Sequence, residues 1–210
     1  MNRIFVEAEK EETSECNFLK ALISKHFPEA EVEYVPMRGV DNLFNESNLN
    51  HMRIAADEGD NVIVLLDADT EEKGWGFAKR QKNVTDKMVS HDVLFPFFLY
   101  PNNHDDGDVE MLMESIARTD LHKGWWDCFN DYEACVRGIQ DTNGEQKYMI
   151  PNRKAKLHTY ISSQRLSRKV RDKLGVGNWL FDNENYWNME SQKLKPLLDF
   201  LNAHIVKPIK

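Results

Sequence analysis

One segment constrains the fold of this chain more than any other. Residues 61–66 read Asn-Val-Ile-Val-Leu-Leu, and Asp67 follows them directly. Because successive side chains of a strand point to opposite faces of a sheet, a run that is apolar at nearly every position predicts a strand buried on both faces. Such strands are typical of the centre of a parallel sheet that carries helices on both sides. The sequence therefore predicts an α/β fold built around this strand.

The rest of the first half alternates apolar runs with helical patterns. The runs at 3–6, 32–35 and 92–100 predict three further strands, and Pro96 requires the last of them to lie at an edge or to contain a bulge. Apolar residues at three- and four-residue steps predict helices at 13–27, 45–58, 71–89 and 108–116. We therefore expect a parallel sheet of about four strands flanked by helices, a Rossmann-like arrangement.

The second half has a different pattern. Helical periodicity occurs at 125–139, 155–174 and 191–205, without a strong strand. We expect residues 1–118 to form the α/β domain and residues 119–210 to form a helical extension packed on it, in one compact unit. A chain of 210 residues with 41% hydrophobic side chains can bury such a core without disulfides or a structural metal.

The composition also indicates a compartment. The three cysteines, Cys16, Cys128 and Cys135, form no C-x-x-C pair, which argues against a disulfide framework and a cysteine zinc site. No stretch approaches the roughly 18 apolar residues of a membrane span, and the acidic N-terminal segment lacks the apolar core of a signal peptide. We therefore expect a cytoplasmic protein without a membrane partner.

The net charge of −8 counts against a module dedicated to wrapping nucleic acid, which usually carries a basic face. An enzyme that meets phosphates locally through a divalent cation stays compatible with this charge. The sequence has no P-loop, no G-x-S-x-G elbow and no histidine pair with zinc-binding spacing, so the corresponding site types lack support.

Three acidic residues follow predicted strands. Glu7 follows the strand at 3–6, and Asp67 and Asp69 follow the strand at 61–66. In an open parallel sheet, ligands bind beyond the carboxyl ends of the strands, so neighbouring strands would bring these carboxylates together. Mg²⁺ and Mn²⁺ prefer such oxygen ligands, and a cation offsets the repulsion between the acids. The alternative is that the aspartates cap a helix or form a turn and that Glu7 belongs to a solvated acidic run.

This pattern resembles a known domain. A strand that ends in Glu, followed after a helix, a strand and a helix by a strand that ends in Asp-x-Asp, is similar to the Toprim domain of topoisomerases, primases and overcoming-lysogenization-defect nucleases. The segments Leu-Tyr-Pro-Asn-Asn at 99–103, Gly-Asp-Val-Glu at 107–110 and Lys-Ala-Lys-Leu-His at 154–158 further resemble the bacterial Toprim-related DUF3226 group.

The resemblance implies roles for five residues. Glu7 would be a metal ligand or general base, Asp67 and Asp69 would bind the metal, Glu110 would add a fourth acid, and Lys156 would stand beside a scissile phosphate. The chain departs from the Toprim pattern in having Ala8 after the glutamate and Gly74 and Gly76 separated by a tryptophan. These departures argue against a topoisomerase or primase role.

Other features have two interpretations each. The basic segment 153–173 and the pair Trp125 and Trp126 could contact nucleic acid, but a solvated helix face and a packing anchor are the more common roles of such residues. His104 lies in a polar loop near the predicted site and would be at most an auxiliary ligand or proton carrier.

Three functions stay open at this stage. The first is Mg²⁺- or Mn²⁺-dependent phosphotransfer on nucleic acid, most concretely a nuclease that acts in phage defence. The second is a non-catalytic or partner-dependent module that works beside a second protein such as an ATPase. The third is a nucleotide-sugar transferase, whose Asp-x-Asp pair would be Asp67 and Asp69.

Overall fold

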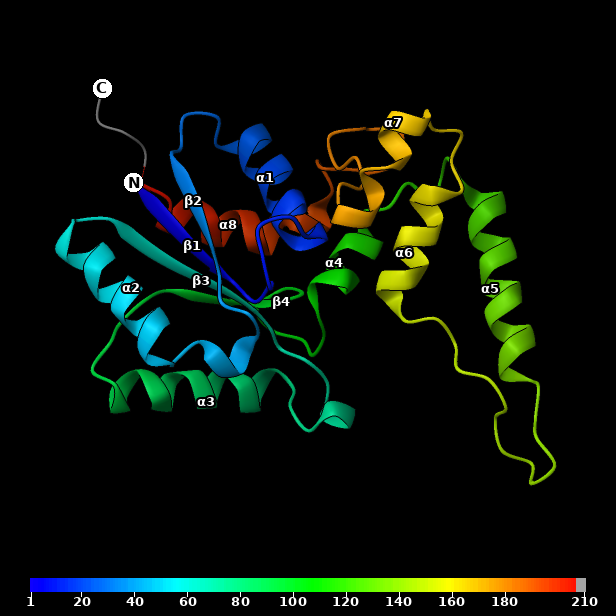
Figure 1. Cartoon of the computed structure of the whole chain (residues 1–210), viewed down its shortest axis with the longest axis horizontal. Helices are drawn as coiled ribbons and strands as arrows, with labels where there is room; N and C mark the ends of the chain where they lie inside the picture. Colours follow the sequence, from blue (N-terminus) through cyan, green and yellow to red (C-terminus); the bar gives the residue numbers. More distant parts are fainter. Residues whose placement is uncertain (207–210) are drawn as a thin grey trace.

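A four-stranded parallel sheet forms the centre of the molecule. The computed structural model describes residues 1–206. The strands β1 (Asn2–Val6), β2 (Val32–Pro36), β3 (Asn61–Asp67) and β4 (Phe97–Tyr100) lie in the order β2-β1-β3-β4, and every neighbouring pair is parallel (Figure 1). β3 is one of the two inner strands, and its residues Ile63 to Leu66 are fully buried. The predicted α/β fold is confirmed.

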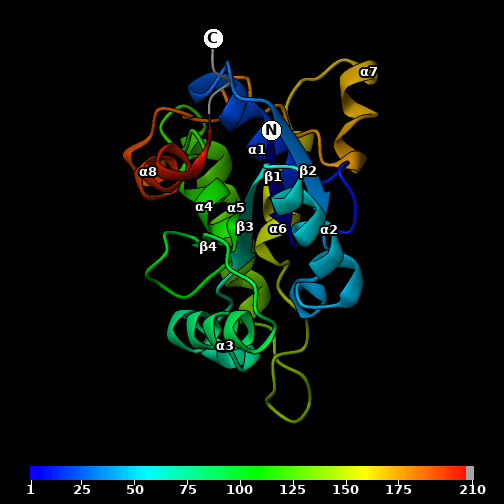
Figure 2. The same cartoon turned by 90° about the vertical axis from the view of Figure 1, so that its left-hand side faces the viewer.

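Helices cover both faces of this sheet (Figure 1 and Figure 2). The helices α1 (Ser14–His26), α4 (Val109–Ser115) and α8 (Lys195–His204) share one apolar core with alternate residues of the strands, among them Ile4 and Leu65. The helices α2 (Glu46–Asp57) and α3 (Phe77–Ser90) share the opposite core with the intervening residues, among them Phe5 and Val64. Successive residues of each strand therefore contribute to two separate cores, which explains why Ile4 to Val6 of β1 and Val62 to Leu66 of β3 are apolar at every position.

The second half adds three more helices beside α4. These are α5 (Lys123–Arg137), α6 (Arg153–Ser162) and the single turn α7 (Arg168–Arg171), and short 3₁₀ turns lie at Leu174–Val176 and Gln192–Leu194. The fully buried Trp187 joins the second half to the core around α1, and its indole N–H donates to the carbonyl of Trp179 at 2.7 Å. α8 returns to the sheet, where the ring of Phe200 lies 5.4 Å from that of Phe98.

Three element boundaries differ from the sequence-based predictions. Residues 71–89 do not form one helix, because Gly74 and Gly76 adopt φ angles of 81° and 111° after a 3₁₀ turn at Glu71–Lys73, and α3 begins only at Phe77. The strand predicted at 92–100 is limited to β4, because Pro96 has no N–H to donate. Of the two predicted possibilities, an edge position or a bulge, the structure has the edge position.

The helix predicted at 155–174 is also interrupted. α6 ends at Ser162, and the hydroxyls of Ser162 and Ser163 donate to the carbonyl of Thr159 at 3.3 and 2.7 Å. Hydroxyls that bond to the backbone in this way compete with continuation of a helix. Helical structure resumes only at α7.

Two compositional expectations also have structural counterparts. Within residues 1–206, no helix is long and apolar enough to cross a membrane. Cys16 is buried, Cys128 and Cys135 are exposed, and all three are free thiols.

Candidate functional site: an acidic pocket at the sheet edge

The ends of the two inner strands bring two acidic residues into contact. Val6, the last residue of β1, pairs with Leu65 of β3, so Glu7 emerges beside the end of β3, where Asp67 lies. The backbone N–H of Asp67 donates to a carboxylate oxygen of Glu7 at 3.3 Å. The parallel register therefore places both side chains at the carboxyl edge of the sheet, where ligands of such folds bind.

Two helices add further acids at this edge. Glu15 lies in the first turn of α1, and Glu110 lies in the first turn of α4. Together with Glu7 and Asp67 they line a cavity of about 440 Å³, which we call the acidic pocket. Lys10, Thr13 and Lys154 line the same cavity.

Burial and neighbouring charges raise the pKa of Glu15, Asp67 and Glu7. Burial, followed by the charges of Glu7 and Glu110, raises the pKa of Glu15 to about 8. Burial, followed by the charges of Glu7, Glu15 and Glu110, raises the pKa of Asp67 well above its ordinary value. The pKa of Glu7 is also raised, mainly by burial, although the N–H of Asp67 opposes this shift. Buried like charges of this kind retain protons or are neutralised by a cation.

Of the polar groups around the acidic pocket, Asp67 has a hydrogen-bond partner in the chain, whereas Tyr100 lacks one among the described residues. One oxygen of Asp67 accepts the N–H of Val109 at 2.9 Å, so Asp67 helps to hold the start of α4. Tyr100, the partner of Asp67 in the β3–β4 register, is fully buried, and its hydroxyl has no hydrogen-bond partner among the residues that the structure describes. Burial, followed by the charges of Glu15 and Asp67, raises the pKa of Tyr100.

Asp69 lies in a different environment. Its carboxylate pairs with Arg80 at 2.7 Å and with Lys73 at 2.9 Å, and the side chain of Arg80 is only 2% exposed. The backbone of Asp69 has a φ angle of 60° and exchanges two hydrogen bonds with Gly107, of 2.7 and 2.8 Å. Asp69 therefore fastens the start of α3 to the 102–107 loop, and it does not line the acidic pocket.

The two basic residues of the 154–158 motif lie in different places. Lys154 lines the acidic pocket and pairs with Glu110 at 3.2 Å. Lys156 lies outside it, pairs with Glu114 at 3.2 Å and Glu133 at 3.5 Å, and thereby connects α6 to α4 and α5. The structure thus brings Glu7, Asp67 and Glu110 together from the predicted set, but not Asp69 or Lys156.

Sequence reasoning missed Glu15 and Lys154. Glu15 was hidden among the exposed acids at 9–12, although it lies three and four residues before Phe18 and Leu19, on the apolar face of the predicted helix. Lys154 belongs to the same motif as Lys156, and only the path of α6 determines which of the two reaches the pocket.

The remaining candidates lie outside the acidic pocket. His104 is exposed and contacts Asp105 at 2.7 Å. Trp125 and Trp126 pack against the ring of Tyr160, with centroid distances of 5.1 and 5.0 Å, which is a packing role.

The donor chemistry of the acidic pocket fits a hard divalent cation. Carboxylates are preferred ligands of Mg²⁺ and Mn²⁺, and a cation would offset the repulsion that raises the pKa values. Within residues 1–206, however, no three histidine, cysteine or acidic side chains are already arranged closely enough to hold a metal ion. Binding would require the carboxylates of Glu7, Asp67 and Glu110 to draw together.

Of the comparisons with known proteins, the one with family models identifies the family of this chain. No curated protein and no solved structure matches the chain. The model of the family described as "Protein of unknown function (DUF3226)" matches residues 1–205, which is nearly the whole sequence. The chain therefore belongs to the DUF3226 family.

Proposed function

We propose that this protein is a Mg²⁺- or Mn²⁺-dependent phosphotransfer enzyme that acts on nucleic acid, most concretely a nuclease of the Toprim type. The observation that carries the proposal is the acidic pocket, in which the buried Glu15 and the partly buried Glu7, Asp67 and Glu110, from two strand ends and two helix starts, line one cavity. The order of Glu7 and Asp67 along the chain, which resembles the Toprim pattern, supports the same chemistry. A role in phage defence belongs to this proposal through that resemblance alone.

In this proposal, each residue of the acidic pocket has a separate role in metal binding, proton transfer or phosphate binding. Glu7, Asp67 and Glu110 would hold the cation, which would polarise a scissile phosphate when bound. Glu15, with its pKa of about 8, is placed to exchange a proton with water near neutral pH. Lys154, which pairs with Glu110, supplies positive charge beside the phosphate. Asp69 would not bind the cation itself. It would position the pocket indirectly, by holding together the loops that follow β3 and β4.

Metal binding and cleavage by a matched pair of variants test the proposal. Asp67→Asn removes a charge but keeps an oxygen that accepts the N–H of Val109. Asp86→Asn is the control, since Asp86 is an exposed residue of α3 that pairs with Lys82 at 2.5 Å. We expect Mn²⁺ binding by calorimetry, and Mg²⁺-dependent cleavage of DNA or RNA, in the wild type and the control but not in Asp67→Asn. Cleavage that persists in Asp67→Asn would refute the assignment.

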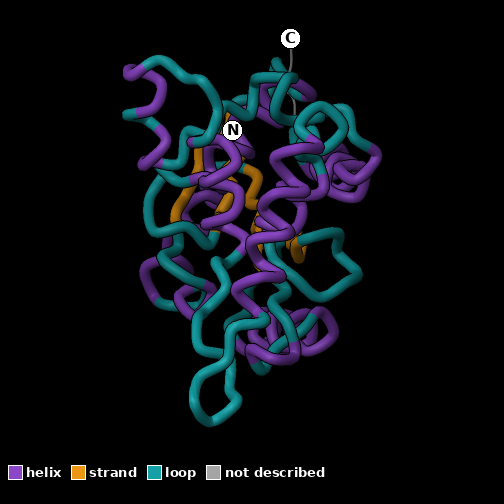
Figure 3. The backbone as a smooth tube through the Cα atoms, turned by 90° about the vertical axis from the view of Figure 1, so that its right-hand side faces the viewer, coloured by secondary structure: helices purple, strands orange, loops and turns teal. Residues whose placement is uncertain are grey.

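A partner-dependent role is the second candidate, and one observation favours it. The segment between α5 and α6 extends beyond the ends of both helices (Figure 1 and Figure 3). It exposes Tyr148 and Met149, and Met149 is 93% accessible to solvent. Exposed apolar side chains close together are typical of protein contacts. If a partner such as an ATPase is required, the purified chain will bind Mn²⁺ but cleave nothing until that partner is added.

The nucleotide-sugar transferase gains no comparable support. That chemistry needs both aspartates of the Asp-x-Asp pair at one metal, whereas Asp69 is paired with Arg80 and Lys73.

A further inference from the structure

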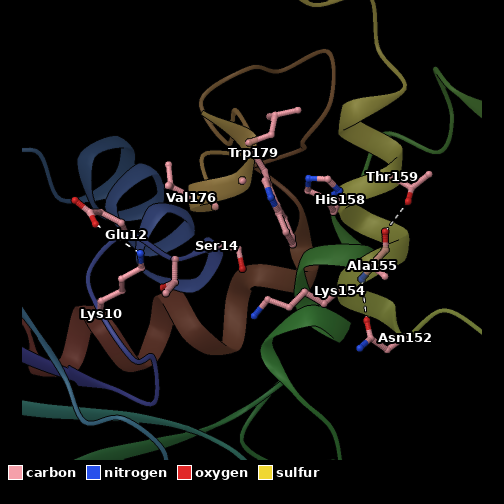
Figure 4. Close-up of a pocket in the computed structure, with 14 residues that line it drawn as sticks. Lys10, Glu12, Ser14, Asn152, Lys154, Ala155, His158, Thr159, Val176 and Trp179 are labelled. Atoms are coloured by element: carbon pink, nitrogen blue, oxygen red, sulfur yellow. Dashed lines mark hydrogen bonds and ion pairs between the residues drawn. The ribbon is translucent and has the colours of Figure 1, made fainter. Parts of the chain in front are cut away.

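A second cavity adjoins the acidic pocket. It has a volume of about 560 Å³ and lies between the start of α1, the helix α6 and the segment 174–179 (Figure 4). Lys10, Thr13 and Lys154 line both cavities, so the two share a wall. We call the second cavity the Lys154 pocket.

The charge of the Lys154 pocket favours an anion. Lys10 and Lys154 line it, and Glu12, an acid of the same lining, lies 3.9 Å from the ammonium of Lys10. Figure 4 shows the side chain of Lys154 reaching from α6 toward Ser14 at the start of α1. The first N–H groups of a helix lack partners within the helix and carry a partial positive charge, so α1 adds to the attraction.

Two buried polar groups of the pocket lack partners. The hydroxyl of Ser14 and the indole N–H of Trp179 have no hydrogen-bond partner within residues 1–206, although the two residues are only 2% and 3% exposed. A buried donor without an acceptor is costly, so such groups are normally satisfied by water or a ligand. The hydroxyl of Ser14 can donate a hydrogen bond to a phosphate oxygen, and the indole N–H of Trp179 can donate one to an acceptor atom of a base.

The opposite wall is apolar and aromatic. Leu174, Val176 and Trp179 line it, and the ring of His158 lies 6.3 Å from that of Trp179. Gly177 fixes the wall against α1, since a Cβ there would fall 2.2 Å from the backbone nitrogen of Ser14. A flat ring such as a nucleobase suits a surface of this kind.

A basic surface leads to this wall. Arg165, Arg168, Lys169, Arg171 and Lys173 immediately precede it in the chain and are all exposed. In the part of the chain that the structure describes, no ion pair involves any of these five side chains, in a protein whose net charge is −8. Unpaired cations on an acidic protein give a local attraction for a phosphate chain.

We propose that the Lys154 pocket binds a nucleotide, with the phosphate near Lys154 and the start of α1 and the base near Trp179. The shared wall then places the nucleotide beside the acidic pocket. The proposal relies on the proposed function only for the idea that the nucleotide belongs to a nucleic acid, because binding itself needs no metal.

Calorimetry in the presence of a chelator tests the binding. We titrate the full chain with adenosine 5′-monophosphate, inorganic phosphate and adenosine. We expect the nucleotide to bind more tightly than phosphate and adenosine to bind at least about tenfold more weakly than the nucleotide, because it lacks the charge-assisted contacts. Absence of nucleotide binding at millimolar concentration would overturn the proposal.

Variants locate the site. Lys154→Ala and Ser14→Ala should weaken nucleotide binding, Lys154→Ala by about tenfold or more. Lys195→Ala is the control, because Lys195 is 63% exposed and paired with Asp199, much as Lys154 is 58% exposed and paired with Glu110. Unchanged affinity in folded Lys154→Ala protein would place the nucleotide elsewhere and refute the assignment.

Two further experiments extend this test. The first separates nucleotide binding from the proposed metal-dependent activity, and the second asks whether the nucleotide is free or part of a nucleic-acid strand. Asp67→Asn should lose Mn²⁺ binding but keep nucleotide binding, so each idea can fail alone. The double variant Arg168→Ala/Lys169→Ala should weaken the binding of a single-stranded oligonucleotide and reduce its salt dependence, without changing the affinity for the mononucleotide. An equal effect on both ligands would contradict the role of the basic surface in guiding a strand.

Discussion

Replacement of Glu15 by glutamine measures how much free energy the acidic pocket costs the folded protein. Glu15 is 8% exposed, and burial together with the charges of Glu7 and Glu110 raises its pKa from an ordinary 4.5 to about 8. Between these values the folded chain retains a proton that the unfolded chain has lost. The contribution of Glu15 to stability is therefore fully present below pH 4.5 and is lost as the pH rises toward 8.

The size of this effect follows from the two pKa values. At pH 7 the difference from 4.5, at about 1.36 kcal/mol for each pH unit, gives a cost of about 3 kcal/mol. At pH 5 the same reasoning gives less than about 1 kcal/mol. Glutamine has nearly the same shape and no charge, and its amide oxygen can still accept the backbone N–H of Ala8, as the carboxylate does.

Urea unfolding in a chelator at pH 5 and pH 7 provides the assay. We expect Glu15→Gln to raise the free energy of unfolding by about 3 kcal/mol at pH 7 and by less than about 1 kcal/mol at pH 5. Glu11→Gln is the control, since Glu11 lies in the same acidic run but is 56% exposed and pairs with Lys20. An equal change at both pH values, or the same change in the control, would refute the reasoning that the Glu15 carboxyl is buried among other acids.

Three further substitutions test the contacts around the site, each by urea unfolding at pH 7. Gly177→Ala should destabilise the protein by more than about 2 kcal/mol, because the φ angle of 77° and the contact with the start of α1 both oppose a side chain. A neutral effect would contradict the close approach of Gly177 to α1. Arg80→Ala should cost about 3 kcal/mol by leaving the carboxylate of Asp69 without its buried partner, and Asp69→Asn in the same background should recover part of the loss. Lys156→Met should lower the free energy of unfolding by about 1–2 kcal/mol, because the pair with Glu114 is lost. Any metal-dependent cleavage should stay unchanged. Loss of cleavage in the folded variant would instead indicate a catalytic role for Lys156.

The pattern of apolar residues is sufficient to predict the architecture. The run that became β3 is apolar at alternate and intervening positions alike, so it could be buried only between two layers of helices. Pro96, which cannot donate a ladder hydrogen bond, restricted the last strand to an edge position or a bulge, and β4 lies at the edge. The positions of Glu7 and Asp67 after their strands also followed from the sequence, because parallel strands end at one edge of a sheet.

Which side chains meet at that edge depends on long-range packing, which the sequence pattern does not reveal. Asp67 and Asp69 are separated by one residue, yet the left-handed backbone of Asp69 turns its carboxylate to Arg80 rather than to the pocket. Glu15 enters the pocket from α1, while Lys154 reaches it from α6, more than a hundred residues later. Periodicity reports which face of an element is buried, but it carries no information about which distant element covers that face. The acidic pocket therefore combines two residues that local pattern could place with others that only long-range packing brought beside them.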